Sequence, residues 1–433
     1  MPEIVLVRHA ESEANAAAAW QGRGNAGLSD AGRRQVAALA RRVEGRRYDA
    51  VVSSPLTRAY ETAAAFSDEP EVEDDLIEID LGKWEGVAFD VVAQSDGVLL
   101  RSIYNGADEP FGEIGERMSE VAARAWAVID RLSERVGPNG RAVVVTHGGV
   151  IDSLLATLLP TVSRRPHRMA ANTSLTHLVG GPGNWHLKRF NDTGHLGRLS
   201  VPAAAYVEAG DPVVALIRHG RTRANVDGRF QGQSCWGLDE VGIEQAQWLA
   251  KWYGPLDRVY TSPLSRAADT AAAISANTPK PVDGLMEIHL GVWEGLTWDD
   301  VWEGWSEAAR RIYEEGEDLP RGENGETWAG ATKRMAETLA SLEFPPGDVT
   351  GVVTHGGVIR AYVGTISGDP SATMSRLATP ENTSITHVAM TADGPVLCDY
   401  GVAPHLEAMP QAVDTCATTT GGMPSSTVGT RAT

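Results

Sequence analysis

The chain carries one long sequence pattern twice, and this repeat restricts its fold more than any other feature. Six segments of the N-terminal half recur in the same order in the C-terminal half. The pairs are VRHAESEAN and IRHGRTRAN, WQGRGNAGLSD and FQGQSCWGLDE, SSPLTRAYETAAA and TSPLSRAADTAAA, LIEIDLGKWEG and LMEIHLGVWEG, VVVTHGGVI and GVVTHGGVI, and NTSLTHL and NTSITHV. Because the spacing between segments is nearly the same in both halves, the repeat predicts two whole domains rather than a shared short motif.

The repeat also indicates where the domains begin and end. We expect a first unit over residues 1–195 and a second unit over residues 211–403. Residues 196–210 contain Gly, Pro and small side chains and are expected to form a linker. Residues 404–433 are rich in Thr, Ser and Gly and have little apolar surface to bury, so we expect a disordered tail.

Strands alternate with helices in each unit. Each unit opens with a short apolar run, EIVLV or VVALI, and Ser29 and Asp239 are suitable N-caps for the first helix. Further helices are expected over Leu56–Phe66, Glu116–Val136, Leu264–Ile274 and Glu326–Leu342. Continuous apolar strands between helices are typical of a mostly parallel sheet covered on both faces. The sequence therefore predicts an α/β fold, a three-layer α/β/α sandwich with a mostly parallel central sheet, duplicated in tandem.

The composition excludes several classes of partner and site. The formal net charge of −19 argues against a broad surface for nucleic acid or for an anionic membrane, so neither is expected as a partner. The cysteines, Cys235, Cys398 and Cys416, are far apart and indicate neither a disulfide framework nor a zinc site. No signal peptide and no apolar run of about 18 residues is found, which predicts a cytoplasmic protein.

Polar residues with catalytic potential follow the predicted strands. In parallel α/β folds, ligands bind beyond the carboxyl ends of the strands, so residues distant in sequence should meet there. The candidates of the first unit are Arg8, His9, Asn15, Arg58, Glu78 and His147. Those of the second unit are Arg218, His219, Asn225, Arg266, Glu287 and His355.

Two arginines and two histidines in one crevice would bind a dianion such as a phosphoryl group. Neutral imidazole, with an ordinary pKa of about 6.5, can act as the nucleophile, and we assign this role to His9 and His219. The second histidine of each set would bind the phosphoryl oxygens. Glu78 and Glu287 are candidates to protonate the leaving group. The chain has neither a glycine-rich phosphate loop nor a carboxylate cluster for Mg²⁺, so no metal and no other cofactor is expected.

These motifs resemble the histidine phosphatase superfamily, also called the phosphoglycerate-mutase-like family, and within it the phosphatases with an acidic proton donor. RHAESEAN, SSPLTRAYETA, LIEIDLGKWEG and VVVTHGGVI carry the resemblance, together with their second copies. The resemblance implies a phosphohistidine on His9 or His219, and a phosphate pocket formed by the arginines and the second histidine of each set. It also implies that Asn15 and Asn225 lie near the phosphate.

The chain departs from the family pattern at a few positions. A Gly-Gly-Glu-Ser segment is common in the family before the long helix, and here Arg117 and Thr327 replace its serine. The first motif has Glu11 in one copy and Arg221 in the other. These differences leave both site sets complete and suggest that the two pockets see different substrates.

The sequence also bears on whether the chain is a mutase rather than a phosphatase. Mutases carry longer insertions and extra basic residues for a second phosphate, whereas here only Arg101 and Arg310–Arg311 are candidates. This favours a metal-independent phosphatase, with two active sites, that hydrolyses small phosphorylated metabolites. A mutase-type phosphotransferase and one non-catalytic, phospho-ligand-binding domain remain as alternatives. The sequence leaves the substrate and the oligomeric state open, although the tandem domains could act as a pseudo-dimer.

Overall fold

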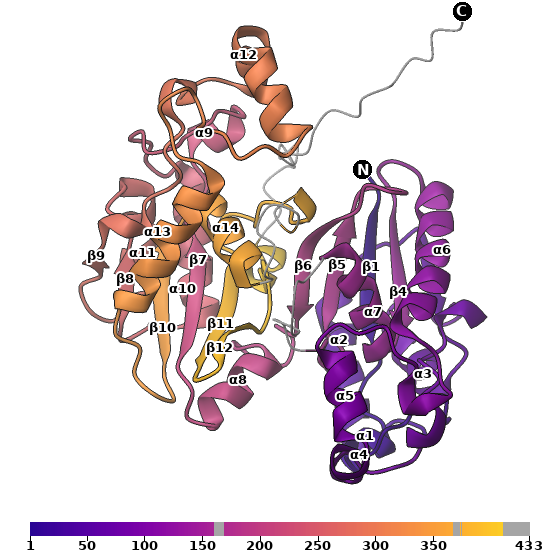
Figure 1. Ribbon diagram of the computed structural model, residues 1–433. Coiled ribbons are helices and arrows are strands. Elements are labelled where there is room, and N and C mark those ends of the chain that lie inside the picture. The colour runs from indigo at the N-terminus through magenta and orange to yellow at the C-terminus, as the bar shows by residue number, and fades with distance from the viewer. Residues whose placement is uncertain (160–168, 367–372, 374, 410–433) are drawn as a thin grey trace, which may run out of the picture.

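The computed structural model describes residues 1–159, 169–366, 373 and 375–409. Each half of the chain forms a six-stranded sheet, and the two sheets have the same strand order, β3-β2-β4-β1-β5-β6 and β9-β8-β10-β7-β11-β12. The first four strands of each order run parallel to one another. The fifth strand pairs antiparallel with both the fourth and the sixth. The two halves lie side by side (Figure 1). The predicted mostly parallel, duplicated fold is therefore confirmed.

The first unit contains β1 (Glu3–Arg8), α1 (Glu13–Ala16), α2 (Asp30–Val43), β2 (Ala50–Ser53), α3 (Thr57–Ala63), β3 (Glu71–Val72), η1 (Asp74–Leu76), η2 (Gly82–Trp84), α4 (Phe89–Ser95), α5 (Gly97–Tyr104), η3 (Phe111–Glu113), α6 (Met118–Val136), β4 (Arg141–Thr146), α7 (Gly148–Leu158), β5 (Leu175–Val179) and β6 (His186–Asp192). Helix α8 (Val201–Glu208) follows.

The second unit contains β7 (Val213–Arg218), α9 (Arg223–Val226), α10 (Glu240–Tyr253), β8 (Val259–Thr261), α11 (Ser265–Ile274), β9 (Lys280–Pro281), η4 (Asp283–Leu285), η5 (Gly291–Trp293), α12 (Trp298–Tyr313), α13 (Trp328–Ser341), β10 (Val349–Thr354), α14 (Gly356–Ile366), β11 (Ile385–Thr391), β12 (Gly394–Leu397) and α16 (Pro404–Glu407).

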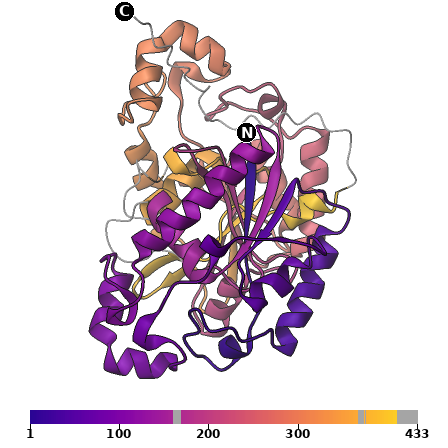
Figure 2. The same cartoon turned by 90° about the vertical axis from the view of Figure 1, so that its right-hand side faces the viewer.

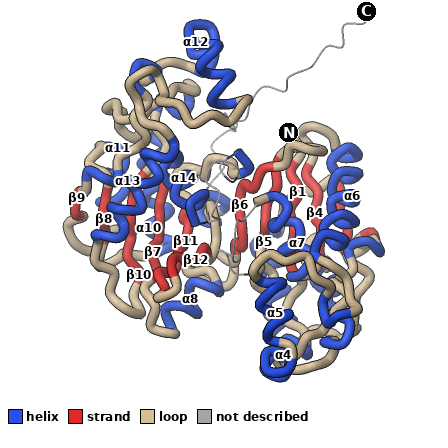
Figure 3. Tube along the Cα trace, viewed as in Figure 1, coloured by secondary structure: helices blue, strands red, loops and turns tan. Residues whose placement is uncertain are grey.

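Helices cover both faces of each sheet, as the alternation of side chains along β1 requires. Ile4 and Leu6 pack into the cluster that contains residues of α6 and α7. Val5 and Val7 point to the opposite face and pack against residues of α2 and α3. All four side chains are buried, which explains why the strand is apolar throughout rather than alternating. Figure 3 marks the strands of each sheet in red and the helices in blue.

The two sheets meet along their antiparallel edges. The backbone N–H groups of Phe190, in β6, and Tyr400, after β12, each donate to the other residue's carbonyl, at 2.9 and 3.0 Å. One apolar cluster runs from the first unit through these two residues into the second. Helices α1 and α9, which follow the first strand of each unit, lie at opposite ends of the molecule in Figure 1. Figure 2 shows the two units turned by 90°. The carboxyl ends of the two sets of parallel strands therefore point in opposite directions.

Some local expectations need correction. The expected linker contains α8, which packs its buried Ala203 against Val213 and Ala389 of the second unit. The predicted tail would begin at residue 404, but residues 404–407 form α16, because Glu407 pairs with buried arginines of the first unit. Residues 410–433 lie outside the described residues. The described helices include none long and apolar enough to cross a membrane.

Helix positions follow the sequence closely. The expected caps are confirmed, because the side chains of Ser29 and Asp239 accept hydrogen bonds from the backbone N–H groups of Gly32 and Gly242. The two long helices begin at Met118 and Trp328, two residues later than expected. Arg117 and Thr327, which replace the family serine, are the N-cap residues of these helices.

Candidate active site

The predicted site residues gather at the carboxyl ends of the parallel strands in both units. Arg8 ends β1, and His9 follows it. His147 follows β4, which pairs with β1 so that Arg8 lies opposite Thr146. The rings of the two histidines have centroids 5.1 Å apart, and the equivalent rings of the second unit are also 5.1 Å apart. Parallel pairing thus places two histidines in contact although they are distant in sequence.

The hydrogen bonds of the first histidine fix its tautomer. His9 is buried, and its Nδ1 lies 2.7 Å from the carbonyl oxygen of Ala10. Since a carbonyl oxygen only accepts, Nδ1 carries the proton and Nε2 keeps its lone pair. His219 makes the same contact with Gly220 at 2.7 Å. Arg58 Nε donates to His9 Nε2 at 3.2 Å, which places that lone pair beside a cation.

The second histidine is the N-cap residue of the helix that follows its strand, where free N–H groups favour an anion. His147 Nε2 lies 2.7 Å from Ser54 Oγ, and Nδ1 is buried without a hydrogen-bond partner among the described residues. His355 Nε2 lies 2.8 Å from Ser262 Oγ. Its Nδ1 accepts a hydrogen bond from Arg266 Nε at 3.3 Å, so the same arginine nitrogen contacts different histidines in the two units.

Backbone carbonyls hold the second arginine. Arg58 is 1% exposed, and its Nη1 and Nη2 donate to the carbonyl oxygens of Gly24 and Gly22 at 2.7 and 2.8 Å. Arg266 donates in the same way to two carbonyls of the equivalent loop, at 2.7 and 2.9 Å. Burial, and the charge of Arg8, lower the pKa of Arg58 to about 10 against the opposing effect of Glu78. The guanidinium is therefore still ionised at neutral pH.

Among the described residues, the first arginine of each unit is held by a hydrogen bond from its Nη1. Arg8 Nη1 donates to Ala170 O at 2.7 Å, and Arg218 Nη1 donates to Pro380 O at 2.6 Å. The Nε of each is buried and has no protein partner within the described part of the chain. A buried N–H without a partner is costly, so both groups are well suited to receive an anionic oxygen.

Burial and positive charge keep the histidines neutral. Burial first, and then the charges of Arg58 and Arg8, hold the pKa of His9 well below its ordinary value. The pKa of His219 is lowered in the same way by burial, Arg218 and Arg266. Because both pKa values are lowered, both rings are neutral at physiological pH. Neutral imidazole is the nucleophilic form.

The carboxyl groups of Glu78 and Glu287 lie at the N-termini of helices α7 and α14. Glu78 Oε2 accepts from the backbone N–H of Gly149 at 3.3 Å, and Glu287 Oε2 accepts from that of Gly357 at 3.0 Å. Burial raises the pKa of Glu78 above its ordinary value, although Arg58 and the backbone donors oppose the effect. A raised pKa favours the protonated acid that can give a proton to a leaving group.

The second glycine of the HGG motif makes room for this acid. A Cβ on Gly149 would lie 2.5 Å from Glu78 Oε1, and one on Gly357 would lie 2.5 Å from Glu287 Oε1. Gly149→Ala should therefore displace the carboxyl and lower kcat of the first unit about 100-fold, a loss that a misplacement of about 1 Å can cause. The measurement is steady-state phosphate release in a chain whose second site is inactivated. Gly181→Ala, whose Cβ would meet nothing within 4 Å, is the control, and equal rates for the two variants would contradict this account.

The asparagines of the first motif act mainly in local capping. Asn15 lies in α1, where its Oδ1 accepts from Ser12 N at 3.2 Å and its backbone N–H donates to the Ser12 hydroxyl. Asn225 forms the same capping box with Thr222. The structure thus places both asparagines next to the site, with their amide oxygens engaged in helix capping.

A second pair of asparagines was missed by sequence reasoning. Asn172 Nδ2 donates to His9 O at 2.9 Å and lies 3.3 Å from Asn15 Oδ1. Asn382 makes the equivalent contacts with His219 and Asn225, at 3.0 and 3.3 Å. Both belong to the repeated NTS segment, so the repeat itself was the available signal.

The model of the histidine phosphatase superfamily, branch 1, matches residues 4–193 and again residues 214–402. The chain belongs to the histidine phosphatase superfamily. It is an enzyme of the phosphatase class, and the resemblance of its motifs is confirmed.

Three relatives illustrate the similarity. The metal-independent phosphoserine phosphatase of Arabidopsis thaliana is 37% identical over 163 residues, which are 36% of this chain and 68% of the relative. A probable phosphoglycerate mutase of Cronobacter sakazakii is 34% identical over 209 residues, 45% of this chain and 95% of that protein. A solved structure of a mycobacterial glucosyl-3-phosphoglycerate phosphatase with VO3 is 31% identical, covers 44% of this chain and 98% of its own, and has a TM-score of 0.40.

Within this histidine phosphatase, the charge reversal in the first motif has a structural cause. Glu11 Oε1 accepts from the hydroxyl of Ser29, the N-cap of α2, at 2.6 Å. Arg221 Nε instead donates to Asp239, the N-cap of α10, at 2.9 Å. The residue of the first motif and the N-cap residue of the next helix therefore differ together between the units: Glu11 is matched to Ser29, and Arg221 is matched to Asp239. Both side chains are engaged with a helix N-cap, so the charge reversal gives no reason to expect different substrates in the two pockets.

The arginines considered for a second phosphate site are separate from the predicted catalytic residues. Arg310 and Arg311 are on α12 and pair with nearby glutamates, Glu307 and Glu317 among them. Arg101 is exposed on α5. None of the three contacts the histidine pair in the described hydrogen bonds.

Proposed function

We propose that each unit hydrolyses small phosphomonoesters through a phosphohistidine, without a metal ion, so that the chain carries two active sites. The observation that best supports this is the fixed tautomer of His9 and His219, in which a backbone carbonyl holds Nδ1–H and leaves Nε2 as the nucleophile. The same arrangement in both units argues against a non-catalytic copy.

The proposed reaction has two steps. His9 Nε2 attacks phosphorus, the bond to the leaving oxygen breaks, and protonated Glu78 gives that oxygen its proton. Water then attacks the phosphohistidine while ionised Glu78 accepts the water's proton, which releases phosphate and restores both groups. Arg8, Arg58 and His147 hold the phosphoryl oxygens, and the two guanidinium groups neutralise their charge, a task that phosphoryl transfer requires in any enzyme.

The substrates to test first are taken from the relatives. Phosphoserine and glucosyl-3-phosphoglycerate are both small phosphomonoesters, and a phosphatase named for each of them is similar to one unit. A mutase-type transfer is the second candidate, because a probable phosphoglycerate mutase is also similar to one unit. A cytoplasmic location stays a prediction from the sequence.

Product analysis distinguishes the two activities. The full chain is mixed with phosphoserine, with glucosyl-3-phosphoglycerate and with 3-phosphoglycerate, and the products are followed by ³¹P NMR. We expect inorganic phosphate as the product of at least one substrate. Formation of 2-phosphoglycerate without free phosphate would contradict the proposed hydrolysis and support a mutase.

The pH dependence should reflect the glutamate rather than the histidines. Because the pKa of His9 is depressed, its protonation should not lower kcat/KM until the pH is well below 6.5. Because the pKa of Glu78 is raised, the proton donor should persist above pH 4.5 and be lost as the pH rises through its pKa. In a His219→Ala chain we expect a basic limb in kcat/KM that Glu78→Gln removes. An acidic limb near pH 6.5, unchanged between substrates, would contradict the low histidine pKa.

A further inference from the structure

The segment of residues 380–383 connects the catalytic residues of the second unit. Pro380 O accepts from Arg218 Nη1 at 2.6 Å, and Asn382 Nδ2 donates to His219 O at 3.0 Å. Thr383 N donates to Arg218 O at 3.0 Å. Any displacement of this segment therefore moves the arginine and the strand end that carries the nucleophile.

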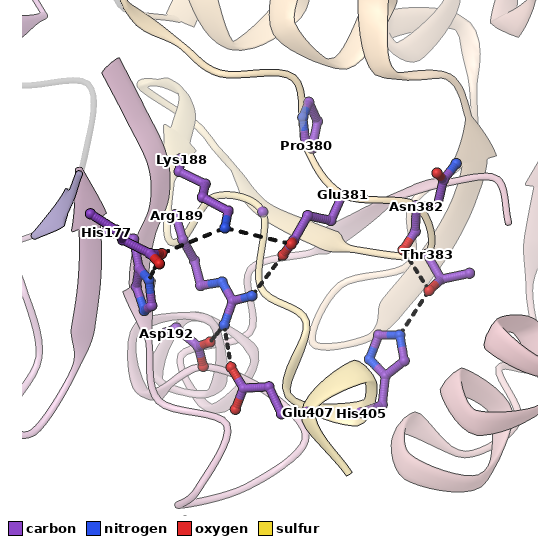
Figure 4. A network of polar contacts seen from close by, with 12 residues as sticks. His177, Lys188, Arg189, Asp192, Pro380, Glu381, Asn382, Thr383, His405 and Glu407 are labelled. Atoms are coloured by element: carbon purple, nitrogen blue, oxygen red, sulfur yellow. Dashed lines mark hydrogen bonds and ion pairs between the residues drawn. The ribbon is translucent and has the colours of Figure 1, made fainter. Parts of the chain in front are cut away.

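Glu381, in the middle of this segment, is bound by the other unit. Its Oε2 accepts from Arg189 Nη2 at 2.8 Å, and its Oε1 lies 3.7 Å from Lys188 Nζ. Both cations belong to β6 of the first unit. Figure 4 shows the carboxylate directed at these two side chains, while Asn382 and Thr383 point elsewhere.

Arg189 is a rigid anchor for this contact. It is buried, and its Nη1 donates to Glu407 Oε1 at 2.6 Å and to Asp192 Oδ2 at 3.1 Å. Arg42 of α2 binds the same two carboxylates, at 2.6 Å to Asp192 and 2.9 Å to Glu407. Although burial raises the pKa of Glu381, Arg189 and Lys188 hold it below its ordinary value, so the carboxylate is ionised at neutral pH.

The first unit holds its equivalent segment by other means. Ala171 stands where Glu381 stands, and its backbone N–H donates to Asn191 Oδ1 at 2.7 Å. The second unit has Gly401 in place of Asn191, since the backbone N–H groups of both residues donate to equivalent threonine hydroxyls. Gly401 offers no side chain, so the second unit lacks this support.

We infer that Glu381 is a positioning residue and that the first unit, through Arg189 and Lys188, holds the catalytic segment of the second unit in place. The ion pair across the interface takes the place of the asparagine contact, which the first unit has and the second unit lacks. This inference rests on the proposed phosphatase activity of the second unit. It makes the second site dependent on the first unit through Glu381.

The test uses the full chain with His9→Ala, in which only the second site turns over. Glu381→Ala introduces the residue that the first unit has at this position, so folding should be preserved. We expect kcat/KM for a phosphomonoester to fall about tenfold, mainly through a higher KM, and competitive inhibition by inorganic phosphate to weaken by the same factor. Glu381→Gln, which keeps one hydrogen bond, should give a smaller loss.

Two controls separate positioning from general stability. Arg46→Met removes an ion pair to Glu407 in the same interface without touching Glu381, and it should leave KM unchanged. In the His219→Ala background, the effect of Glu381→Ala should be absent, because the first site has its own support. Melting temperatures of all variants are compared in parallel.

The outcomes distinguish this inference from the proposed function. An active His9→Ala chain whose KM and phosphate inhibition do not respond to Glu381→Ala would overturn the positioning role alone. An equal effect of Glu381→Ala on both sites would also overturn it, since that indicates general destabilisation. A His9→Ala chain that neither turns over nor binds phosphate would contradict the proposed function of the second unit, and the positioning role would fall with it.

Discussion

Replacing His9 and His219 together by alanine is expected to lower the phosphatase kcat/KM by about 10⁴-fold or more, because the two substitutions remove both of the proposed nucleophiles. Each single variant should keep the activity of the intact unit, since each unit has a complete set of site residues. Steady-state phosphate release by the two single variants and the double variant is the measurement. The melting temperature of each shows that the chain is folded.

The two single variants serve as controls for each other. If the units differ in substrate, each single variant should lose turnover of one substrate and keep that of the other. A double variant that retains more than a few per cent of the wild-type rate would contradict the assignment of these histidines as nucleophiles. A His9→Ala chain with no turnover of any substrate would indicate a non-catalytic second unit.

Replacing Glu78 by glutamine in a His219→Ala chain is expected to lower kcat/KM for phosphoserine by about 10²–10⁴-fold, the usual range for loss of a general acid. The amide keeps the shape of the side chain and has no acidic proton to give. Because p-nitrophenol leaves without protonation, kcat/KM for p-nitrophenyl phosphate, which reports only the steps up to formation of the phosphohistidine, should fall much less. The ratio of the two losses is the measured quantity.

Glu85→Gln is the matched control. Glu85 lies close to Glu78 in sequence, but its Oε1 accepts from the backbone N–H of Arg23 at 2.9 Å and so holds the loop that binds Arg58. Its replacement should affect both substrates equally. If Glu78→Gln also lowered both rates by one factor, Glu78 would be a structural residue and the proton donor would lie elsewhere.

Much of the fold was predictable because the repeated features act locally. The apolar run of β1 is buried on both faces, and this identified a central parallel strand before its partners were known. Ser29 and Asp239 were recognisable as caps because the side-chain oxygen bonds three residues ahead. Helix α16 was not predictable, because Glu407 is held by Arg42 and Arg189, which are distant in sequence.

The candidate site was predictable in its members but not in its contacts. Parallel strands bring residues at their carboxyl ends together, so Arg8, His9 and His147 could be grouped from sequence. The tautomer of His9 depends on a backbone carbonyl, and the orientation of Arg58 depends on two loop carbonyls, which no side-chain pattern encodes. The roles of these residues in catalysis stay predictions.

Direct trapping of the phosphoenzyme tests the central claim. The chain is mixed with a ³²P-labelled phosphomonoester for which turnover has been established, and is quenched in alkaline denaturant, because phosphohistidine is hydrolysed by acid. The account predicts label on peptides containing His9 and His219 in the wild type, on one peptide in each single alanine variant, and on none in the double variant. Turnover by the wild type without label on either histidine, or label that persists in the double variant, would contradict it.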